Sequence, residues 1–405
     1  MRIATTSFIL VLTVLNAAAQ SQFLVIGRNT GMYPALDGNS IRIFGFTQTL
    51  SSPVYIPAPT LTFIEGDSVE VDFWNVSQGA PHTIHLHGLD LDQQNDGVPH
   101  LSFEVGHMEH GYYRFRAPHA GTYLYHCHVT SPIHVQAGMY GLVVIRPPGG
   151  GNTTWAGGYE YDSDHAWLTS EMDTFWHQEA VLNHDHDSTN PGMQVLLPDY
   201  HPQYFLVNGL SENQLTDPNE RLTAAVNERV YLRLANVGFM ANRYEFPPGL
   251  NALIVSSDGR PLPATESSDT LWVFPGERFG VMLTPQQEFV STVAVGFVDL
   301  NTLNQKSVQH IPVTVSGYFG VNDPARTDLF VFPNPTADLL SVRLGEEAFH
   351  TILVYDMFGR CVHETTIPAG ADEVRIDLHD VPPGTYTLEA WGSSNRTAHR
   401  IVIIR

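Results

Sequence analysis

The sequence predicts an all-β protein built from several small sandwich domains. Apolar residues such as Val69, Val71 and Phe73 alternate with Glu70 and Asp72, and this period of two is typical of a half-buried strand. Turn residues separate such runs along the chain, which has 33 Gly and 27 Pro. The length of 405 residues exceeds that of one ordinary domain of roughly 150 residues. We therefore expect several β-rich domains rather than one.

The composition excludes one broad class of partner. The chain has 20 Lys and Arg against 42 Asp and Glu, which leaves a net charge of −22 at pH 7. Nucleic-acid phosphates require a basic binding surface, so we expect no nucleic-acid partner. No apolar stretch reaches the roughly 20 residues needed to cross a bilayer, so we expect no transmembrane segment.

The first residues predict export. Arg2 precedes an apolar run from Phe8 to Leu15, and small residues follow up to Ala19. A basic start, a short apolar run and a small-residue end are typical of a secretory signal peptide, here residues 1–19. We therefore expect a protein that is exported through the periplasm and is either secreted or held at the cell surface.

Changes in the strand pattern predict the domain boundaries. Residues 147–152, PPGGGN, interrupt the pattern and end the first domain. The next segment has little periodicity and contains His177, His184 and His186, so we expect an irregular connector there. The expected organisation is signal peptide 1–19, first sandwich 20–150, connector 151–203, second sandwich 204–320, linker 321–327 and C-terminal sandwich 328–405.

The stretch YLYHCHVTSPIHVQAGMYG concentrates side chains that bind metals. Its candidate ligands are His126, Cys127, His128, His134 and Met139. A thiolate, imidazoles and a weak axial thioether form the ligand set of a blue, or type 1, copper site. The chain has only 2 Cys. Because a metal explains Cys127 better than a disulfide does, we expect Cys127 and Cys361 to be unpaired.

An upstream motif, PHTIHLHG, supplies further histidines. Side chains alternate along a strand, so His85 and His87 share one face. By the same rule His126 and His128 share a face, and Cys127 points away from them. The residues therefore sort into two predicted copper sites. The first is the type 1 set of His82, Cys127, His134 and Met139, and the second consists of His85, His87, His126 and His128.

These motifs, HxxHxHG and HCH…HxxxGM, resemble those of the multicopper oxidase family, whose domains are cupredoxin folds. The resemblance implies two cupredoxin-like Greek-key β-sandwich domains. It places the first ligand set on type 1 copper positions and the second on type 2 and type 3 positions, where the family reduces dioxygen. The implied activity is oxidation of a phenolic compound or a metal ion, with Cys127 linking the two sites through His126 and His128.

The resemblance also predicts a gap in the second copper site. The family's dioxygen site uses more histidines than the four that the first domain supplies. The second domain has none between His201 and His310. Asn242, Arg243 and Tyr244 stand where a liganding domain would show His-x-His, so this domain resembles the copper-free middle domain of three-domain oxidases.

The missing ligands have two candidate sources, and the function has alternatives. His177, His184 and His186 of the connector are one source, and a neighbouring subunit of a homo-oligomer is the other. With an unfinished cluster, the chain would be a non-enzymatic electron-transfer or copper-binding protein. A copper nitrite reductase is a further alternative: His87 and His126 would match its type 2 ligands, although His85 stands where those enzymes use an acid.

The C-terminal residues carry a second resemblance. Short apolar runs separated by Asn-Pro and Pro-Gly turns predict a small β-sandwich over 328–405. Its motifs resemble those of the type A sorting domain that directs cargo to the type IX secretion system, which implies that secretion machinery as a partner. The motifs are FPNP at 332–335, VYD at 354–356, GR at 359–360, PPGTY at 382–386 and the basic Arg400 and Arg405.

Overall fold

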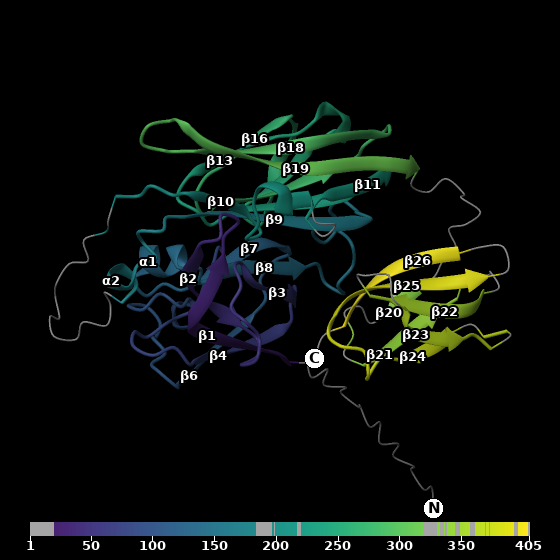
Figure 1. Cartoon of the computed structure of the whole chain (residues 1–405), viewed down its shortest axis with the longest axis horizontal. Helices are drawn as coiled ribbons and strands as arrows, with labels where there is room; N and C mark the ends of the chain where they lie inside the picture. Colours follow the sequence, from purple (N-terminus) through teal and green to yellow (C-terminus); the bar gives the residue numbers. More distant parts are fainter. Residues whose placement is uncertain are drawn as a thin grey trace, which may run out of the picture. The chain divides into compact units, whose positions relative to one another are not determined.

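The computed structural model describes most of the chain, and strands dominate it (Figure 1). The chain divides into two compact units, Met1–Phe319 and Gly320–Arg405. The predicted signal peptide and the linker at 321–327 lie outside the described residues. The structure describes residues 20–183, 197, 199–216, 220–318, 330–332, 336, 338–344, 349–356, 361–368, 370–371, 373–392 and 396–403.

The first part of Met1–Phe319 is a sandwich of two 4-stranded sheets. One sheet has the order β2-β1-β4-β6, formed by Ser40–Thr47, Gln20–Pro34, Ser68–Asn75 and His110–Arg116. The other has the order β3-β8-β7-β5, formed by Ala58–Ile64, Tyr140–Arg146, Gly121–His126 and His85–His87. Val69, Val71 and Phe73 of β4 are buried between the sheets. The predicted sandwich fold of this region is confirmed.

A second sandwich follows in the same unit. Its 6-stranded sheet has the order β10-β9-β12-β17-β14-β15, formed by Tyr204–Val207, Ser163–Met172, Val230–Asn236, Arg278–Leu283, Leu253–Ser257 and Arg260–Ser267. Its 5-stranded sheet has the order β11-β19-β18-β13-β16, formed by Leu222–Val226, Gln305–Tyr318, Phe289–Val298, Ala241–Glu245 and Thr270–Val273. Apolar side chains of both sheets fill the space between them.

Strand β9 lies in the segment that the sequence pattern predicts to be irregular. It pairs with β12 in parallel and with β10 in antiparallel fashion, so it belongs to the second sandwich. All residues from Trp167 to Met172 are buried. A strand buried on both faces shows no alternation and usually reads as an apolar run. Here the buried polar residues Thr169, Ser170 and Glu171 interrupt that run, so neither pattern marks the strand. The prediction of an irregular connector at 151–203 is therefore wrong for Ser163–Met172.

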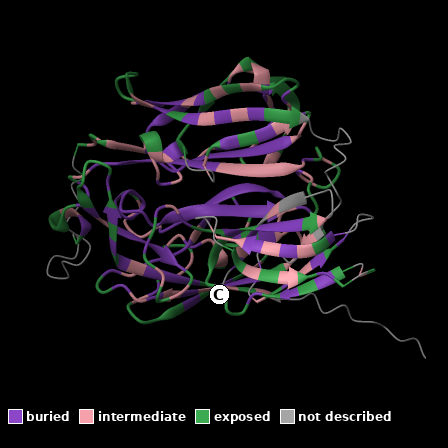
Figure 2. Cartoon of the chain, turned by 45° about the vertical axis from the view of Figure 1, so that its right-hand side comes forward, coloured by how far each residue is buried: buried purple, intermediate pink, exposed green. Residues whose placement is uncertain are grey.

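The two sandwiches of this unit pack against each other through a buried apolar cluster. The cluster joins Leu124 and Leu142 of the first sandwich to Leu168 and Ala235 of the second. Arg233 of β12 also donates from Nη1 to Thr122 Oγ1 at 3.1 Å across this boundary. Figure 2 shows buried residues running along the strands of both sandwiches. The second sandwich is thereby held in one position against β7, the strand that leads into the metal-binding motif.

Two short helices, α1 (Ser131–Gln136) and α2 (Glu179–Leu182), lie at one end of the first sandwich (Figure 1). Single 3₁₀ turns occur at Gln93–Asn95, Glu212–Thr216 and Pro248–Leu250. None of the described helices has the length and apolar character that a membrane-crossing helix needs.

Gly320–Arg405 contains the small sandwich predicted for the C-terminus. One sheet has the order β20-β21-β24, formed by Phe330–Phe332, Leu339–Arg343 and Glu373–Asp377. The other has the order β23-β22-β25-β26, formed by Cys361–Thr366, Phe349–Tyr355, Gly384–Gly392 and Arg396–Ile403. Leu340, Ile352, Leu388 and Ile401 lie in its core. Cys361 is exposed, and both cysteines are unpaired, as predicted.

Candidate metal centre

The structure brings three of the four predicted type 1 ligands together. The ligand atoms of His82, Cys127 and His134 all lie within 4.8 Å of one another. Cys127 Sγ is 3.5 Å from His82 Nδ1 and 3.3 Å from His134 Nδ1. All three residues are buried, and Met139 lies in the same core as Cys127. We call these four residues the first cluster.

The loop after β7 produces the first cluster. The N–H of Cys127 donates to the carbonyl of Met139 at 3.0 Å, and the N–H of Met139 donates to the carbonyl of His134 at 3.0 Å. Gly138 has a φ of 113°, and a Cβ at this position would lie 2.7 Å from the carbonyl oxygen of Phe44. Only glycine fits such a backbone conformation and such a close approach. The turn at Gly138 therefore returns Met139 to the side of Cys127.

The four histidines predicted for the other site also gather, and we call them the second cluster. β5 pairs with β7 so that His85 lies opposite His126. The ligand atoms of His85, His87 and His126 lie within 4.8 Å of one another, and His87 Nδ1 is 3.3 Å from His126 Nε2. The ring centroids of His128 and His85 are 5.1 Å apart. The strands thus separate the two ligand sets as the alternation of side chains predicts.

Backbone carbonyls orient two rings of the second cluster. His85 Nδ1 lies 2.7 Å from the carbonyl oxygen of Asp96, and His126 Nδ1 lies 2.9 Å from that of Cys127. Because a carbonyl only accepts, Nδ1 of each ring carries the proton and Nε2 presents its lone pair to the cluster. His87 differs, since its Nδ1 is the atom that faces His126. His85 and His126 thereby have a defined donor atom for a metal, Nε2.

Burial favours the neutral form of His85, His87 and His126 by lowering the pKa of each ring. Desolvation lowers the pKa of His126 to about 3 and, together with the nearby Arg278, lowers the pKa of His87 to about 4. Burial also lowers the pKa of His85. A neutral imidazole is the form that binds a metal, so these rings are ready to do so at pH 7. A thiolate with imidazoles, and a group of imidazoles, are both donor sets that suit copper.

The second sandwich presents an arginine to the second cluster. Arg278, whose side chain is 4% exposed, donates to the Gly276 carbonyl at 2.6 Å and pairs with Asp258 at 3.0 Å. Gly276 lies against the cluster, since a Cβ there would be 3.1 Å from His87 Cε1. Sequence reasoning missed Arg278 because nothing in the order of residues relates β17 to β5. Its only signal is its burial in the folded chain.

The other candidate ligands do not join either cluster within the described residues. His177 is buried, and its Nδ1 lies 2.6 Å from the carbonyl oxygen of Arg42. His184 and His186 lie outside the described residues. Asn242 is buried in the second sandwich, where its Oδ1 accepts a hydrogen bond from Thr169 Oγ1 at 2.5 Å.

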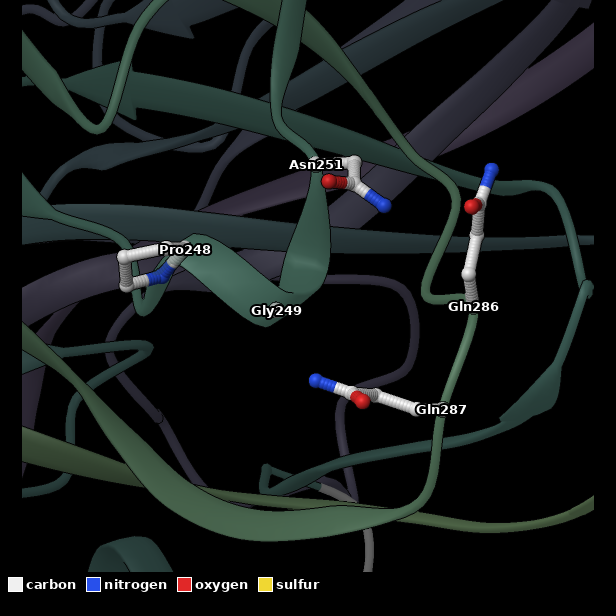
Figure 3. A pocket seen from close by; sticks show the side chains of 5 residues that line it. All are labelled: Pro248, Gly249, Asn251, Gln286 and Gln287. Atoms are coloured by element: carbon white, nitrogen blue, oxygen red, sulfur yellow. The ribbon is translucent and has the colours of Figure 1, made fainter.

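Two surface hollows lie on the described part of the second sandwich. One, of about 460 Å³, is lined by Pro248, Gly249, Asn251, Gln286 and Gln287 (Figure 3). Another, of about 410 Å³, is lined by Ala241, Trp272, Phe274, Val298, Leu300 and Leu303. Neither lining includes a histidine, a cysteine or a carboxylate, so neither hollow is a candidate metal site.

Comparison with known protein families identifies the family of both sandwiches in Met1–Phe319. Two family models, both described as "Multicopper oxidase", match residues 48–150 and 169–312, together more than half of the chain. A third, "Secretion system C-terminal sorting domain", matches residues 330–404. The second match begins inside β9, which agrees with the place of this strand in the second sandwich.

Individual proteins that resemble this chain have modest sequence identity to it. The chain is 29% identical over 273 residues to "Copper resistance protein A" of Pseudomonas syringae pv. tomato, covering 59% of this chain and 43% of the relative. It is 25% identical over 260 residues to "L-ascorbate oxidase" of Cucumis sativus, covering 57% and 41%. The matches thus span less than half of these relatives. The crystal structure of a blue copper oxidase from Nitrosomonas europaea shares the fold, with a TM-score of 0.58, 24% identity and coverage of 74% of this chain and 86% of that chain.

Proposed function

This chain belongs to the multicopper oxidase family, and we propose that it is an exported copper-dependent oxidoreductase that takes electrons from a phenolic or metal-ion donor and reduces dioxygen. One observation carries the proposal: the two clusters meet at a single tripeptide. Cys127 belongs to the first cluster, and its neighbours His126 and His128 belong to the second. An electron passing between the clusters would therefore have a short covalent path.

Each cluster has its own role in the proposed reaction. Bound copper would supply one-electron transfer at the first cluster and dioxygen reduction at the second. His82, Cys127 and His134 would bind the first metal, and Met139 would be a further, weak donor. His85, His87, His126 and His128 would hold the second group of copper, with protons kept on Nδ1 of His85 and His126 by their carbonyl partners.

We infer that a neighbouring copy of the chain completes the second cluster. His85, His87 and His128 are only partly buried, whereas the first cluster is enclosed. Among the described residues the second sandwich adds Arg278 rather than a further imidazole. A homo-oligomer in which another subunit supplies the remaining ligands accounts for both observations.

A non-enzymatic electron-transfer or copper-binding protein is the second candidate function. The lack of a further imidazole favours this candidate: among the described residues, the second cluster contains four imidazoles and no more. The nitrite reductase alternative fits less well, because His85 is part of the cluster where those enzymes use an acid.

Export completes the proposal. The sorting domain matched at 330–404 indicates export by type IX secretion. We propose that the protein crosses the periplasm on this route and acts outside the cell or at its surface.

The copper content of the purified protein and its oxygen consumption separate the two candidate functions. The oxidase should bind more than about two copper ions per chain and consume oxygen in the presence of a phenol or a reduced metal ion. The electron-transfer protein should bind about one copper ion and consume no oxygen. A copper-loaded protein without the intense absorption at about 600 nm of a type 1 site would refute both.

A further inference from the structure

Helix α1, which contains the candidate ligand His134, is too short to be stable by itself. α1 has 6 residues, its N-cap Thr130 makes no side-chain cap hydrogen bond, and its fourth residue is His134. Isolated helices of this length are unstable in water, because nucleation is unfavourable and the end groups lack partners. The position of His134 must therefore depend on contacts that α1 makes with the rest of the fold.

Gln136, the last residue of α1, supplies such contacts, and they all lead to the second sandwich. Gln136 is buried, and its Oε1 accepts the N–H of Asp173, directly after β9, at 2.8 Å. Its Nε2 donates to the hydroxyl of Tyr200 at 3.2 Å. Tyr200 in turn donates to Glu171 Oε2 of β9 at 3.2 Å. Gln136 lies between His134 and Met139 in the sequence, so this chain of hydrogen bonds anchors the loop between the two ligands.

Aromatic packing joins the same segments. The ring of Tyr200 lies 5.6 Å from that of Trp176 and 5.0 Å from that of Phe239. All three rings pack in or against the core that contains Cys127 and Met139. Residues that follow β9 and β12 therefore belong to, or pack against, the same core as Cys127 and Met139.

Glu171, the last residue in this series of hydrogen bonds, is buried at a cost in folding free energy. Glu171 is 2% exposed, and desolvation raises its pKa to about 7. Its Oε2 accepts the N–H of Phe239 at 2.8 Å, while its Oε1 has no hydrogen-bond partner among the described residues. Burying a polar atom without a partner destabilises a fold, so such a group calls for a functional reason.

We propose that Glu171 and Tyr200 are positioning residues that act through Gln136 to hold His134 and Met139 in place for the type 1 metal. The second sandwich thus contributes the outer support of the first cluster. This inference rests on the proposed function, because it assumes that the first cluster binds type 1 copper. Residues that orient metal ligands typically change metal affinity when they are replaced.

The test compares variants that alter the hydrogen bonds of Tyr200 and Glu171 and keep the packing. Tyr200→Phe keeps the ring against Trp176 and Phe239, and Glu171→Gln keeps the size of the side chain. The matched control is Tyr231→Phe, which removes a buried hydroxyl bonded to Ser256 in a separate cluster of the second sandwich. We expect copper binding at the first cluster to weaken about 10- to 100-fold in the two test variants and not in the control. The absorption at about 600 nm and the copper hyperfine splitting in EPR should shift with it.

Each result decides the question. Unchanged spectra and copper affinity in Tyr200→Phe and Glu171→Gln, beside a wild type with a normal type 1 band, would overturn this inference and leave the proposed function intact. A lower melting temperature with an unchanged spectrum would also overturn it, since that is the signature of a merely structural role. A wild type without a type 1 band would overturn the proposed function, and this inference with it.

Discussion

The two clusters differ in how far the chain encloses them. The first is sealed, since His82 is 1% exposed and Cys127 and His134 are 0% exposed, and both sandwiches support its loop. The second opens outward at His85, His87 and His128, and the second sandwich places Arg278 beside it. The residues of the enclosed cluster all come from one sandwich of this chain, whereas the partly exposed cluster leaves room for a further ligand. We propose above that a neighbouring copy of the chain supplies that ligand.

The largest expected effect comes from removing the thiol of the first cluster. Cys127→Ser should abolish the absorption at about 600 nm, because that band arises from the copper–thiolate bond. Copper bound by the imidazoles of the second cluster should remain. Cys361→Ser is the control, since Cys361 is exposed and lies in the C-terminal sandwich. Retention of the band in Cys127→Ser would end the assignment of the first cluster.

Loss of copper binding at the second cluster should leave copper binding at the first cluster unchanged. His87→Ala removes the ring whose Nδ1 faces His126, so copper bound there should be held at least about 10-fold more weakly while the band at about 600 nm persists. His110→Ala is the control, because His110 is exposed and pairs with Asp72 away from both clusters. Loss of the band in His87→Ala would show that the clusters are not separate sites. Copper content by elemental analysis and absorption spectra provide the measurement.

A pH effect of intermediate size should trace to the buried imidazoles. Burial lowers the folded-state pKa of His87 to about 4 and of His126 to about 3, below the ordinary value of about 6.5. Between these pKa values the unfolded chain binds more protons than the folded protein does. The contribution of the two neutral histidines to the free energy of unfolding is therefore complete above about pH 6.5 and is lost as the pH falls. The metal-free protein should lose at most about 1.4 kcal/mol per pH unit for each histidine in that window. Thermal unfolding from pH 7 to pH 4 measures it, and His126→Gln should flatten the dependence. An equal slope in both proteins would contradict the account.

The smallest effect on copper content is expected from adding histidines to the second sandwich. Asn242→His with Tyr244→His restores a His-x-His pattern, yet both side chains lie in the core, where Tyr244 stacks on Trp167 at 6.5 Å. The double variant should bind no additional copper and should be destabilised by about 2 to 4 kcal/mol. Binding of extra copper in elemental analysis would mean that this sandwich can still build a metal site. Chemical denaturation measures the loss of stability.

The strand pattern predicted most of the fold, and its failure has a clear cause. β4 was visible because Val71 and Phe73 point inward while Asp72 is only partly buried. β9 was not visible, because its buried half lies between two neighbouring strands and under apolar groups on both faces. Alternation of polar and apolar residues predicts a strand that has one buried face, and it does not predict a strand that is covered on both faces.

The ligand types of the candidate site could be read from the sequence because they are close together in the chain. His126, Cys127 and His128 occupy one strand end, and the alternation of side chains sorts them without reference to any other segment. Gln136, Glu171 and Tyr200 could not be found in this way. Their roles arise from hydrogen bonds between segments that are far apart in sequence, and no local pattern records such pairs.

The sequence by itself determined the β-sandwich class, the two ligand sets and their division between opposite faces, since composition, spacing and strand alternation are local properties. Only the tertiary structure decided which cluster is closed. It brought Asp173 and Tyr200 to the loop of the first cluster and Arg278, instead of an imidazole, to the second. The physical reason is that enclosure and electrostatic surroundings depend on the packing of one sandwich against the other, which forms only when the whole unit has folded.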